Sequence, residues 1–366
     1  MQTIQNPPTI EDAIDKKIGE VRTEALDLSF GEIANLHAAD PSELIIQPEY
    51  QRLFRWSTEQ RSRLIESILL ELPIPQIFVI EKTNAVIELI DGLQRVSSVI
   101  QFIQPEALKL NPLRLQGCNL IPELNGKVFT DLSLKLRLRL KRSSVRTIVI
   151  KRQSSSLLGY EMFKRLNTGG ANPAPQEIRN CTARMLGDHG VEFYRFIQES
   201  AEYTAFKNCT ETLSQADREQ KGDEELVLRF FALKNGLHLF RGSVRDWLDD
   251  YMEEVLLSRL PFDYAVETAI FNDLFSYLDQ ILGAGAFVRY RGSTPVGALV
   301  PAYYEAVTNG FLSCLESIRK VPGDQIRQKL IEVVQSQGFR DNTGPGANSK
   351  EKLQNRISAV REALLA

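Results

Sequence analysis

The stretch VIELIDGLQRVSSVIQFI, residues 86–103, changes its hydrophobic period at a single point. Its first five residues are mostly aliphatic, as in a β-strand, and this run ends at Asp91-Gly92. Beyond Gly92 the apolar residues recur at three- and four-residue spacing, which is typical of an amphipathic helix. The sequence therefore predicts a strand, a tight turn and a helix, with Asp91, Gln94 and Arg95 gathered around the helix start.

The start of this helix is a candidate site for an anion such as phosphate. The first N–H groups of a helix have no intrahelical partner and lie at the positive end of the helix dipole. Gly92 would let the backbone approach the anion, and Arg95 would add a forked cationic donor. Helix capping explains Asp91 and Gln94 without any ligand, because they nearly form a capping box. The chain contains no GxxxxGK[ST] loop and no G-x-G-x-x-G fingerprint.

The residues on either side of this stretch predict a small mixed domain. Ser57 and Gln60 form a capping box at the start of a helix with one apolar face. Residues 77–81 and 86–90 have strand composition and are separated by a short turn, which indicates a hairpin. For residues 131–141, DLSLKLRLRLK, strict alternation favours a strand whereas the residue types favour a helix.

The second half of the chain has the pattern of helices. Residues 145–151 are the last clear strand, and Pro175 is placed to open a helix. Further helices are expected over 190–201, 223–235, 243–258, 263–282, 296–308, 310–320, 323–337 and 348–365, with a polar interruption at 283–297. Four charged residues within this region are expected to form an internal network: Arg218, Asp223, Glu224 and Arg229. We predict an α+β fold with a lead-in at 1–25, a mixed-sheet domain at 26–155 and an all-helical region at 156–366.

The composition is that of an ordinary globular protein with an uneven distribution of charge. The chain has 366 residues, a net charge of −3, 43% hydrophobic residues and 25% charged residues. Residues 132–160 contain no acid and several bases, so a local anion-binding face is compatible with the acidic total. The residues of this run that we expect to face nucleic acid are Arg137, Arg139, Lys141 and Arg142.

The cysteines and the apolar runs restrict the setting of the protein. The four cysteines are scattered without CxxC spacing, which favours a reduced, cytoplasmic protein and argues against a zinc site. The polar, mixed-charge start of the chain does not have the pattern of a signal peptide. No apolar run approaches the ~20 residues that a membrane helix needs, so no membrane partner is expected.

Four motifs together resemble one known family. YQRLFRW at 50–56, LIESILLELPIPQIFVIE at 64–81, IDGLQR at 90–95 and FKRLNTGG at 163–170 are similar, in order and spacing, to the N-terminal domain family of GmrSD-type restriction systems. The likeness extends over residues 30 to about 235, and the tail is similar to that of standalone members. It implies a ParB/sulfiredoxin-like mixed sheet domain followed by helices. It also implies a helix at residues 131–141.

The resemblance also implies an activity, because the D-G-Q-Q-R motif of this family binds and hydrolyses nucleotides in defence against foreign DNA. Asp91, Gly92, Gln94 and Arg95 match the motif by position, whereas Leu93 replaces a glutamine, which puts turnover in doubt more than binding. We expect Asp91, Gln94 and Arg95 to be catalytic and a nucleoside triphosphate to bind with Mg²⁺, for which Asp91 is the candidate ligand. The nucleotide-binding candidates are Gly92, Arg95, Arg52, Arg55, Lys164 and Asn167.

Three functions remain open. The first is a nucleotide-binding phosphohydrolase that acts as sensor or regulatory component of a restriction-like, anti-phage system. The second is a ParB-like module that binds or nicks DNA, and the third is a non-catalytic scaffold. The three histidines, His37, His189 and His238, are far apart, so no HNH nuclease domain is expected, and a separate nuclease chain becomes a candidate partner. The oligomeric state is open, including a homo-oligomer.

Overall fold

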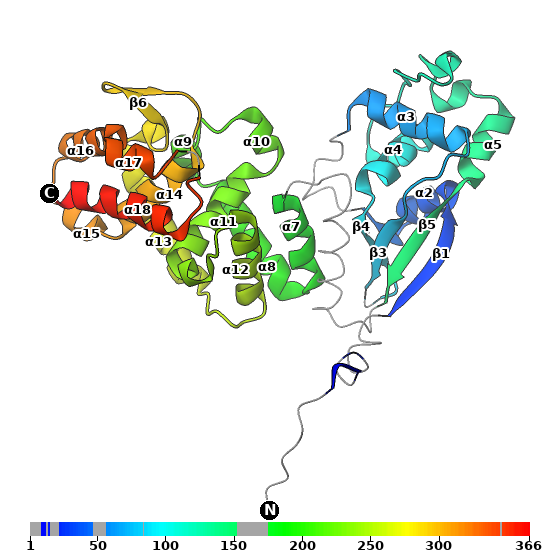
Figure 1. Ribbon diagram of the computed structural model, residues 1–366. Coiled ribbons are helices and arrows are strands. Elements are labelled where there is room, and N and C mark those ends of the chain that lie inside the picture. Colours follow the sequence, from blue (N-terminus) through cyan, green and yellow to red (C-terminus); the bar gives the residue numbers. More distant parts are fainter. Residues whose placement is uncertain are drawn as a thin grey trace, which may run out of the picture. The chain divides into compact units, whose positions relative to one another are not determined.

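The computed structural model describes residues 9–11, 14, 22–46, 56–82, 84–151, 175–344 and 346–366. The chain divides into two compact units, residues 1–163 and 164–366. The first unit contains a mixed β-sheet and the second is mostly helical (Figure 1). The predicted α+β fold class is therefore confirmed.

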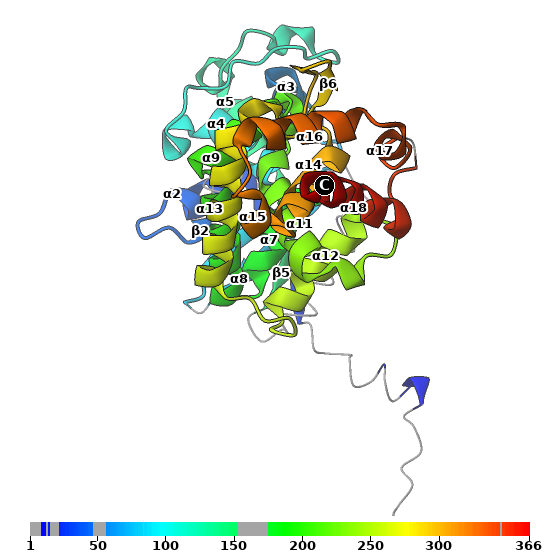
Figure 2. The same cartoon turned by 90° about the vertical axis from the view of Figure 1, so that its left-hand side faces the viewer.

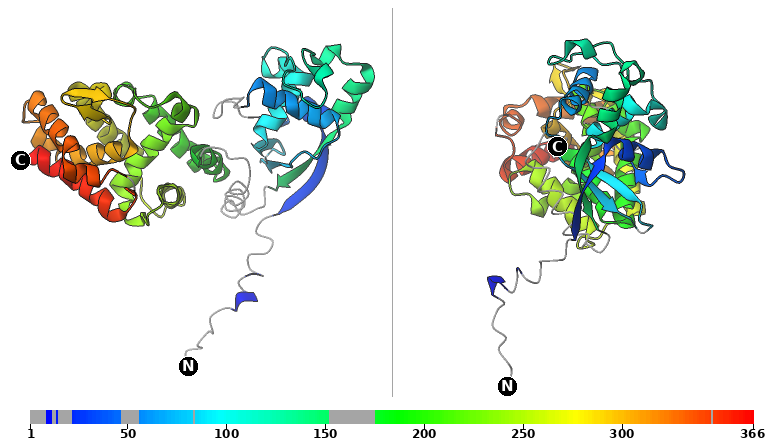
Figure 3. Two further views of the ribbon diagram at one scale, coloured as in Figure 1. Left: turned by 45° about the horizontal axis from the view of Figure 1, so that its top comes forward. Right: turned by 90° about the vertical axis from the view of Figure 1, so that its right-hand side faces the viewer.

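A five-stranded mixed sheet organises the first unit, in the order β1-β5-β3-β4-β2. β1 (Thr23–Ser29) is antiparallel to β5 (Ser144–Ile150), and Figure 3 shows them as long neighbouring strands. β5 is parallel to β3 (Ile77–Glu81), which is antiparallel to β4 (Ile87–Asp91). The short β2 (Leu44–Ile45) lies parallel to β4. This order places the start of β3 and the end of β4 at the same edge of the sheet.

The β3–β4 pair contains a register shift just before the predicted site. Val79 pairs with Leu89, whereas Phe78 pairs with Asp91, so Ile90 is an extra residue on β4. A bulge of this kind bends the strand and redirects the side chains that follow it, and bulges are frequent beside functional sites. The bulge therefore sets the direction in which the chain leaves the sheet at Asp91.

Four helices share one hydrophobic core with this sheet: α2 (Phe30–Ala38), α3 (Thr58–Leu69), α4 (Leu93–Ile103) and α5 (Leu134–Arg142). α3 begins with the predicted capping box, in which Gln60 Oε1 accepts a hydrogen bond from Ser57 N at 2.9 Å. The predicted strands at 77–81 and 86–90 and the helix that follows Gly92 are confirmed within one residue. Short 3₁₀ helices complete the unit: η2 (Pro105–Leu108), η3 (Pro122–Leu124) and η4 (Phe129–Asp131).

The conflict over residues 131–141 is resolved in favour of a helix. Ser133 caps α5 by accepting a hydrogen bond from Leu136 N at 3.4 Å. Leu140 is fully buried, whereas Leu134 and Leu138 are 64% and 37% exposed. The alternating leucines thus point in different directions around the helix, and only part of them face the core.

β1 is an element that the sequence did not predict. It begins at Thr23, inside the segment expected to be a lead-in, and all seven of its residues pair with β5. Its burial pattern shows no fully buried position. The strand therefore depends on pairing with a partner more than 110 residues away in sequence.

The second unit is an assembly of helices, in which α18 lies against α14 and α16 (Figure 2). Its helices are α7 (Pro175–Met185), α8 (Asp188–Ala201), α9 (Thr204–Cys209), α10 (Gln215–Glu219), α11 (Gly222–Asn235), α12 (Val244–Leu256), α13 (Tyr264–Ile281), α14 (Pro301–Leu312), α15 (Leu315–Ile318), α16 (Gly323–Gln335), α17 (Gln337–Asp341) and α18 (Lys350–Leu365). Two 3₁₀ helices are η5 (Leu237–Leu239) and η6 (Gly283–Gly285).

The expectation of an all-helical region is wrong at one place. β6 (Arg289–Arg291) and β7 (Thr294–Val296) form an antiparallel hairpin within the expected polar interruption. The helix expected at 296–308 instead begins at Pro301, because β7 includes Val296 and proline favours the first helical position.

A chain of charges with alternating sign connects five helices inside this unit. Its successive contacts are Asp249–Arg179 at 2.6 Å, Arg179–Glu225 at 3.0 Å, Glu225–Arg229 at 2.9 Å, Arg229–Glu305 at 2.8 Å and Glu305–Arg356. These residues come from α12, α7, α11, α14 and α18. Of the predicted internal network, Arg229 belongs to this chain and Glu224 is buried on the same helix, whereas Arg218 binds the carbonyl of Thr210. We call this series of contacts the ionic chain.

Candidate functional site

The turn between β4 and α4 has the shape that the sequence predicts. β4 ends at Asp91 and α4 begins at Leu93, so Gly92 alone connects them and is the N-cap residue. Among the described residues, no side chain caps the first turn of α4. The alternative in which Asp91 caps this helix is therefore wrong, and the helix start keeps its capacity to bind an anion.

Gly92 is required at this turn for two reasons. Its φ is +100°, in the left-handed region that side chains disfavour. A Cβ atom there would also lie 2.5 Å from Ile77 Cγ2 and 3.3 Å from Arg95 Nη2. Glycine at this position thus permits close packing against the buried Ile77 of β3 and against Arg95.

Asp91 and Arg95 form an ion pair at this turn. Asp91 Oδ2 lies 2.9 Å from Arg95 Nη2, which also donates to the carbonyl of Gln76 at 3.1 Å. The side chains are 35% and 18% exposed, so both are partly screened from water. Arg95 Nε is buried and has no hydrogen-bond partner among the described residues. A buried donor without a partner calls for an explanation, such as a bound ion or water.

Gln94 connects this turn to another of the sequence motifs. Its Oε1 accepts a hydrogen bond from the backbone N–H of Trp56 at 3.2 Å. Trp56 is the last residue of YQRLFRW, so the motif at 50–56 ends beside the start of α4. In this arrangement the Gln94 amide oxygen holds the backbone of Trp56 through one of its two lone pairs.

Four of the predicted binding residues, Arg52, Arg55, Lys164 and Asn167, lie outside the described residues. Gln76 and Ile77, in contrast, contact the turn from the start of β3, and the sequence did not predict these contacts. The sequence signal was present in LPIPQI, where two prolines precede β3, because a residue before proline is held extended. That signal predicts a fixed segment but not what the segment contacts.

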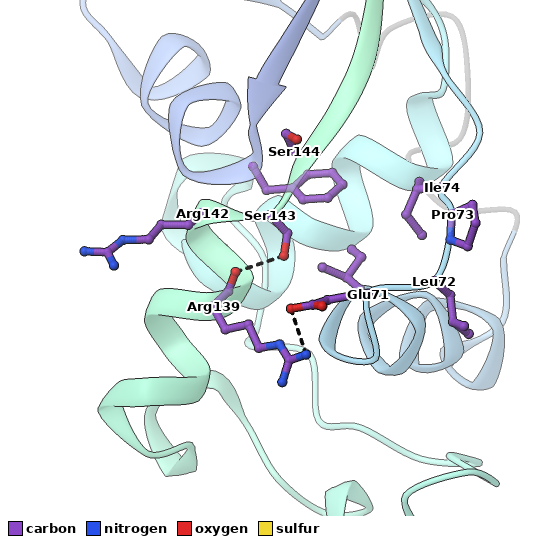
Figure 4. Close-up of a pocket in the computed structure, with 10 residues that line it drawn as sticks. Glu71, Leu72, Pro73, Ile74, Arg139, Arg142, Ser143 and Ser144 are labelled. Carbon is purple, nitrogen blue, oxygen red and sulfur yellow. Dashed lines mark hydrogen bonds and ion pairs between the residues drawn. The ribbon is translucent and has the colours of Figure 1, made fainter.

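The predicted nucleic-acid-binding residues all lie on α5. Arg139 forms an ion pair with Glu71 at 2.8 Å, and Lys141 Nζ lies 5.7 Å from the ring centroid of Phe129. Arg142 is exposed and points away from the Arg139–Glu71 pair in Figure 4. Arg137 is half-buried, and its Nε has no partner among the described residues. The four cations thus lie on one helix, and two of them have partners within the same unit.

A cavity of about 490 Å³ lies beside this helix (Figure 4). Its apolar wall includes Ile68, Leu72 and Ile74, and its polar wall includes Arg139 and Arg142. Glu71, the ion-pair partner of Arg139, also lines it. An anion with an apolar portion would find complementary groups on both walls.

The described cysteines are buried and unpaired: Cys118, Cys209 and Cys314. Burial raises the pKa of the Cys118 thiol to about 11, so this thiol is protonated at neutral pH. Among the described residues, no three His, Cys, Asp or Glu side chains are grouped as metal ligands would be.

None of the helices in the described part of the chain is both long and apolar enough to cross a membrane.

Comparison with known proteins gives one family. Residues 32–183 match the model of the GmrSD restriction endonuclease N-terminal domain. This region is therefore similar to the N-terminal domain of GmrSD-type restriction systems. The match includes α3, the β3–β4 hairpin, the Gly92 turn, α5 and β5, and it ends within α7. No curated protein and no solved structure matches the chain significantly.

The GmrSD-type domain and the two compact units overlap only in part. β1 precedes the matched residues, although it pairs with β5 inside the matched region. α7 lies within the match and yet belongs to the helical unit, where Arg179 joins the ionic chain. The family description links the protein to restriction systems.

Proposed function

We propose that the Gly92 turn binds a nucleoside triphosphate and that the protein is a nucleotide phosphohydrolase. It would act as sensor or regulatory component of a DNA-directed, restriction-like defence system. The observation that carries this proposal is the uncapped start of α4 beside Arg95, whose buried Nε has no partner among the described residues. The GmrSD-type domain supports the restriction setting.

The ion pair with Asp91 is compatible with phosphate binding. Asp91 and the Gln76 carbonyl both engage Nη2 of Arg95, so the pair fixes the guanidinium and leaves Nε unused by them. A guanidinium has five N–H donors in a rigid fork and can bind more than one acceptor. A phosphate oxygen would then accept from Arg95 and from the free N–H groups of α4.

Mg²⁺ fits this turn only together with the nucleotide. Asp91 supplies one carboxylate, and Oδ2 is already paired with Arg95. Mg²⁺ commonly binds through one or two carboxylates while the substrate phosphates supply other ligands. Asp91 would hold such an ion through its remaining oxygen, and the ion would neutralise phosphate charge. Arg95 would position the phosphates and screen them from water.

Gln94 would have a structural contact in addition to the role that the sequence predicts, which is to position the attacking water or a phosphate oxygen. Because its amide oxygen accepts from the Trp56 backbone, Gln94 would also hold Trp56 beside the start of α4. Activation of the attacking water would then depend on Asp91 or on the nucleotide itself. Phosphoryl transfer depends mainly on positioning and charge neutralisation, so a small set of residues can suffice.

Calorimetry with each Mg²⁺-nucleoside triphosphate tests this proposal. The wild-type protein is expected to bind at least one of them below millimolar concentration. Arg95→Ala should weaken binding about 10- to 100-fold, because hydrogen bonds to charged groups contribute about 1.5–3 kcal/mol. Arg146→Ala is the matched control, since Arg146 also pairs with an aspartate, Asp27, at 3.2 Å in the same sheet.

The outcomes separate the three functions. No binding by the wild-type protein at millimolar nucleotide, or equal loss in both variants, would contradict the nucleotide proposal. Binding without release of phosphate would favour the scaffold, in which Leu93 has cost the protein its turnover. Metal-dependent nicking of DNA that Asp91→Asn abolishes would favour the ParB-like module.

DNA binding by α5 is a second candidate function, favoured by its exposed cations and the adjacent cavity. Arg142→Ala is expected to reduce the slope of log affinity against log salt by about 0.9, because one phosphate contact is lost. Gel shifts with duplex DNA over a salt series measure this slope. The same slope in the variant would exclude Arg142 from a DNA interface. If the protein binds both ligands, a separate nuclease chain would respond to whether nucleotide and DNA are bound to it.

A further inference from the structure

The β6–β7 hairpin is a small ribbon that projects basic side chains from the helical unit. Arg289 lies opposite Val296 and Arg291 lies opposite Thr294 across the two strands. Side chains alternate along a strand, so both arginines are on one face and Tyr290 is on the other. Both arginines are exposed, whereas Tyr290 is 7% exposed.

The inner face of the hairpin is fixed to the helices. Tyr290 donates a hydrogen bond to the carbonyl of Gly285 at 2.9 Å. A Cβ atom at Gly285 would lie 2.6 Å from the Tyr290 hydroxyl, so glycine makes room for this contact. At the turn, Gln335 of α16 donates to the carbonyl of Gly292 at 2.7 Å. The ribbon is therefore held at its base and at its tip, although it has only two strands.

The outer face of the hairpin has two arginines whose charges no described carboxylate pairs with. Neither Arg289 nor Arg291 has a hydrogen bond or ion pair with any described residue, whereas Arg179, Arg229 and Arg356 are all paired in the same unit. The hydroxyl side chains of Ser293 and Thr294 are exposed beside them. An anchored element that presents two free guanidinium groups and two hydroxyls is suited to an anionic partner with repeating charges.

We propose that the outer face of the β6–β7 hairpin contacts the backbone of double-stranded DNA. Neighbouring strands are about 4.8 Å apart, and the major groove is about 12 Å wide and admits a two-stranded ribbon. The two arginines are separated by about 6.6 Å along the strand, which is close to the rise of two nucleotides, about 3.4 Å each, along the helix axis. This contact lies in the helical unit and does not depend on the Gly92 turn.

Fluorescence anisotropy with a labelled 20-base-pair duplex tests the contact over a series of salt concentrations. The double variant Arg289→Ala/Arg291→Ala should lower the slope of log affinity against log salt by about 1.8, or about 0.9 for each phosphate. At 0.1 M salt this corresponds to weaker binding on the order of 50-fold. Nucleotide binding by the same variant should equal that of the wild-type protein.

A matched control separates a local contact from a change in net charge. Arg195 and Arg241 are also exposed arginines of the helical unit that lack partners among the described residues. Arg195→Ala/Arg241→Ala removes the same charge and should leave the slope unchanged. Equal losses in the two double variants would overturn the proposal, as would a wild-type protein that fails to bind the duplex at low salt. An unchanged hairpin variant would also overturn it and would leave an acidic protein as the partner to test.

Discussion

Replacing Glu305 by alanine is expected to lower the free energy of unfolding of the helical unit by about 3–5 kcal/mol, because it leaves the buried Arg356 without its carboxylate partner and Arg229 with Glu225 alone. Glu305 lies between two arginines: Oε1 accepts from Arg229 Nη1 at 2.8 Å, and Oε2 accepts from Arg356. The three side chains are 3%, 10% and 2% exposed, so water cannot replace the lost carboxylate. This is the most deeply buried part of the ionic chain.

Urea unfolding followed by tryptophan fluorescence measures the effect. The chain has two tryptophans, and Trp247 is 1% exposed within the helical unit. A Trp56→Phe background makes Trp247 the single reporter and keeps the backbone N–H that binds Gln94. Asp273→Ala is the control, because the Asp273–Arg319 pair is exposed and such pairs contribute about 0–1 kcal/mol.

A triple variant distinguishes lost charge compensation from a simple cavity. Arg229→Met/Glu305→Leu/Arg356→Met replaces the triad by apolar side chains, and such replacements are often neutral or stabilising. We therefore expect the triple variant to recover most of the stability that Glu305→Ala loses. A triple variant less stable than the single one would contradict this account, as would a single variant no worse than Asp273→Ala.

The ionic chain also has a consequence for how the family region is attached to the rest of the protein. α7 lies inside the matched residues, and Arg179 on it is 2% exposed and bound to Glu225 and Asp249. The end of the matched region is thereby fixed to helices that follow it in sequence.

Local pattern was sufficient where a segment's own residues determine its structure. The change of period at Gly92 gave β4 and α4, and the Ser57–Gln60 spacing gave the capping box of α3. Pattern failed where structure depends on distant partners. TEALDLS has weak alternation, and its strand forms by pairing with β5. Each strand of the β6–β7 hairpin has only three residues, so the nearby glycines and serine suggested a loop.

The candidate site shows the same division at the level of single residues. Spacing could suggest that Asp91 and Gln94 cap a helix, but it could not show that Gly92 occupies the N-cap position instead. Once Asp91 is the last residue of β4, its carboxylate is free to pair with Arg95, four residues later. The contact of Arg95 with Gln76 joins segments 19 residues apart, and no local rule predicts it.

Gly92→Ala is expected to destabilise the sheet unit by about 2–5 kcal/mol, the sum of a left-handed backbone cost of about 1–2 kcal/mol and an overpacking cost of about 1–3 kcal/mol. Gly126→Ala separates the two costs, because Gly126 also has a positive φ of +80° and no atom within 4 Å of its added Cβ. Hydrogen exchange of the α4 amides measures the difference, since a tenfold loss of protection corresponds to about 1.4 kcal/mol.

A double variant identifies the clash as the cause. The added Cβ at Gly92 would lie 2.5 Å from Ile77 Cγ2 and 3.0 Å from Ile77 Cβ, so Ile77→Ala should remove most of the steric part of the cost and leave the backbone part. In the Ile77→Ala background, Gly92→Ala should therefore cost about as much as Gly126→Ala, a coupling that a double-mutant cycle reports. If Gly92→Ala costs the same in both backgrounds, packing against β3 is not what requires glycine at this turn. The requirement would then lie on the other side of Gly92, near Arg95 and the anion that we propose it binds.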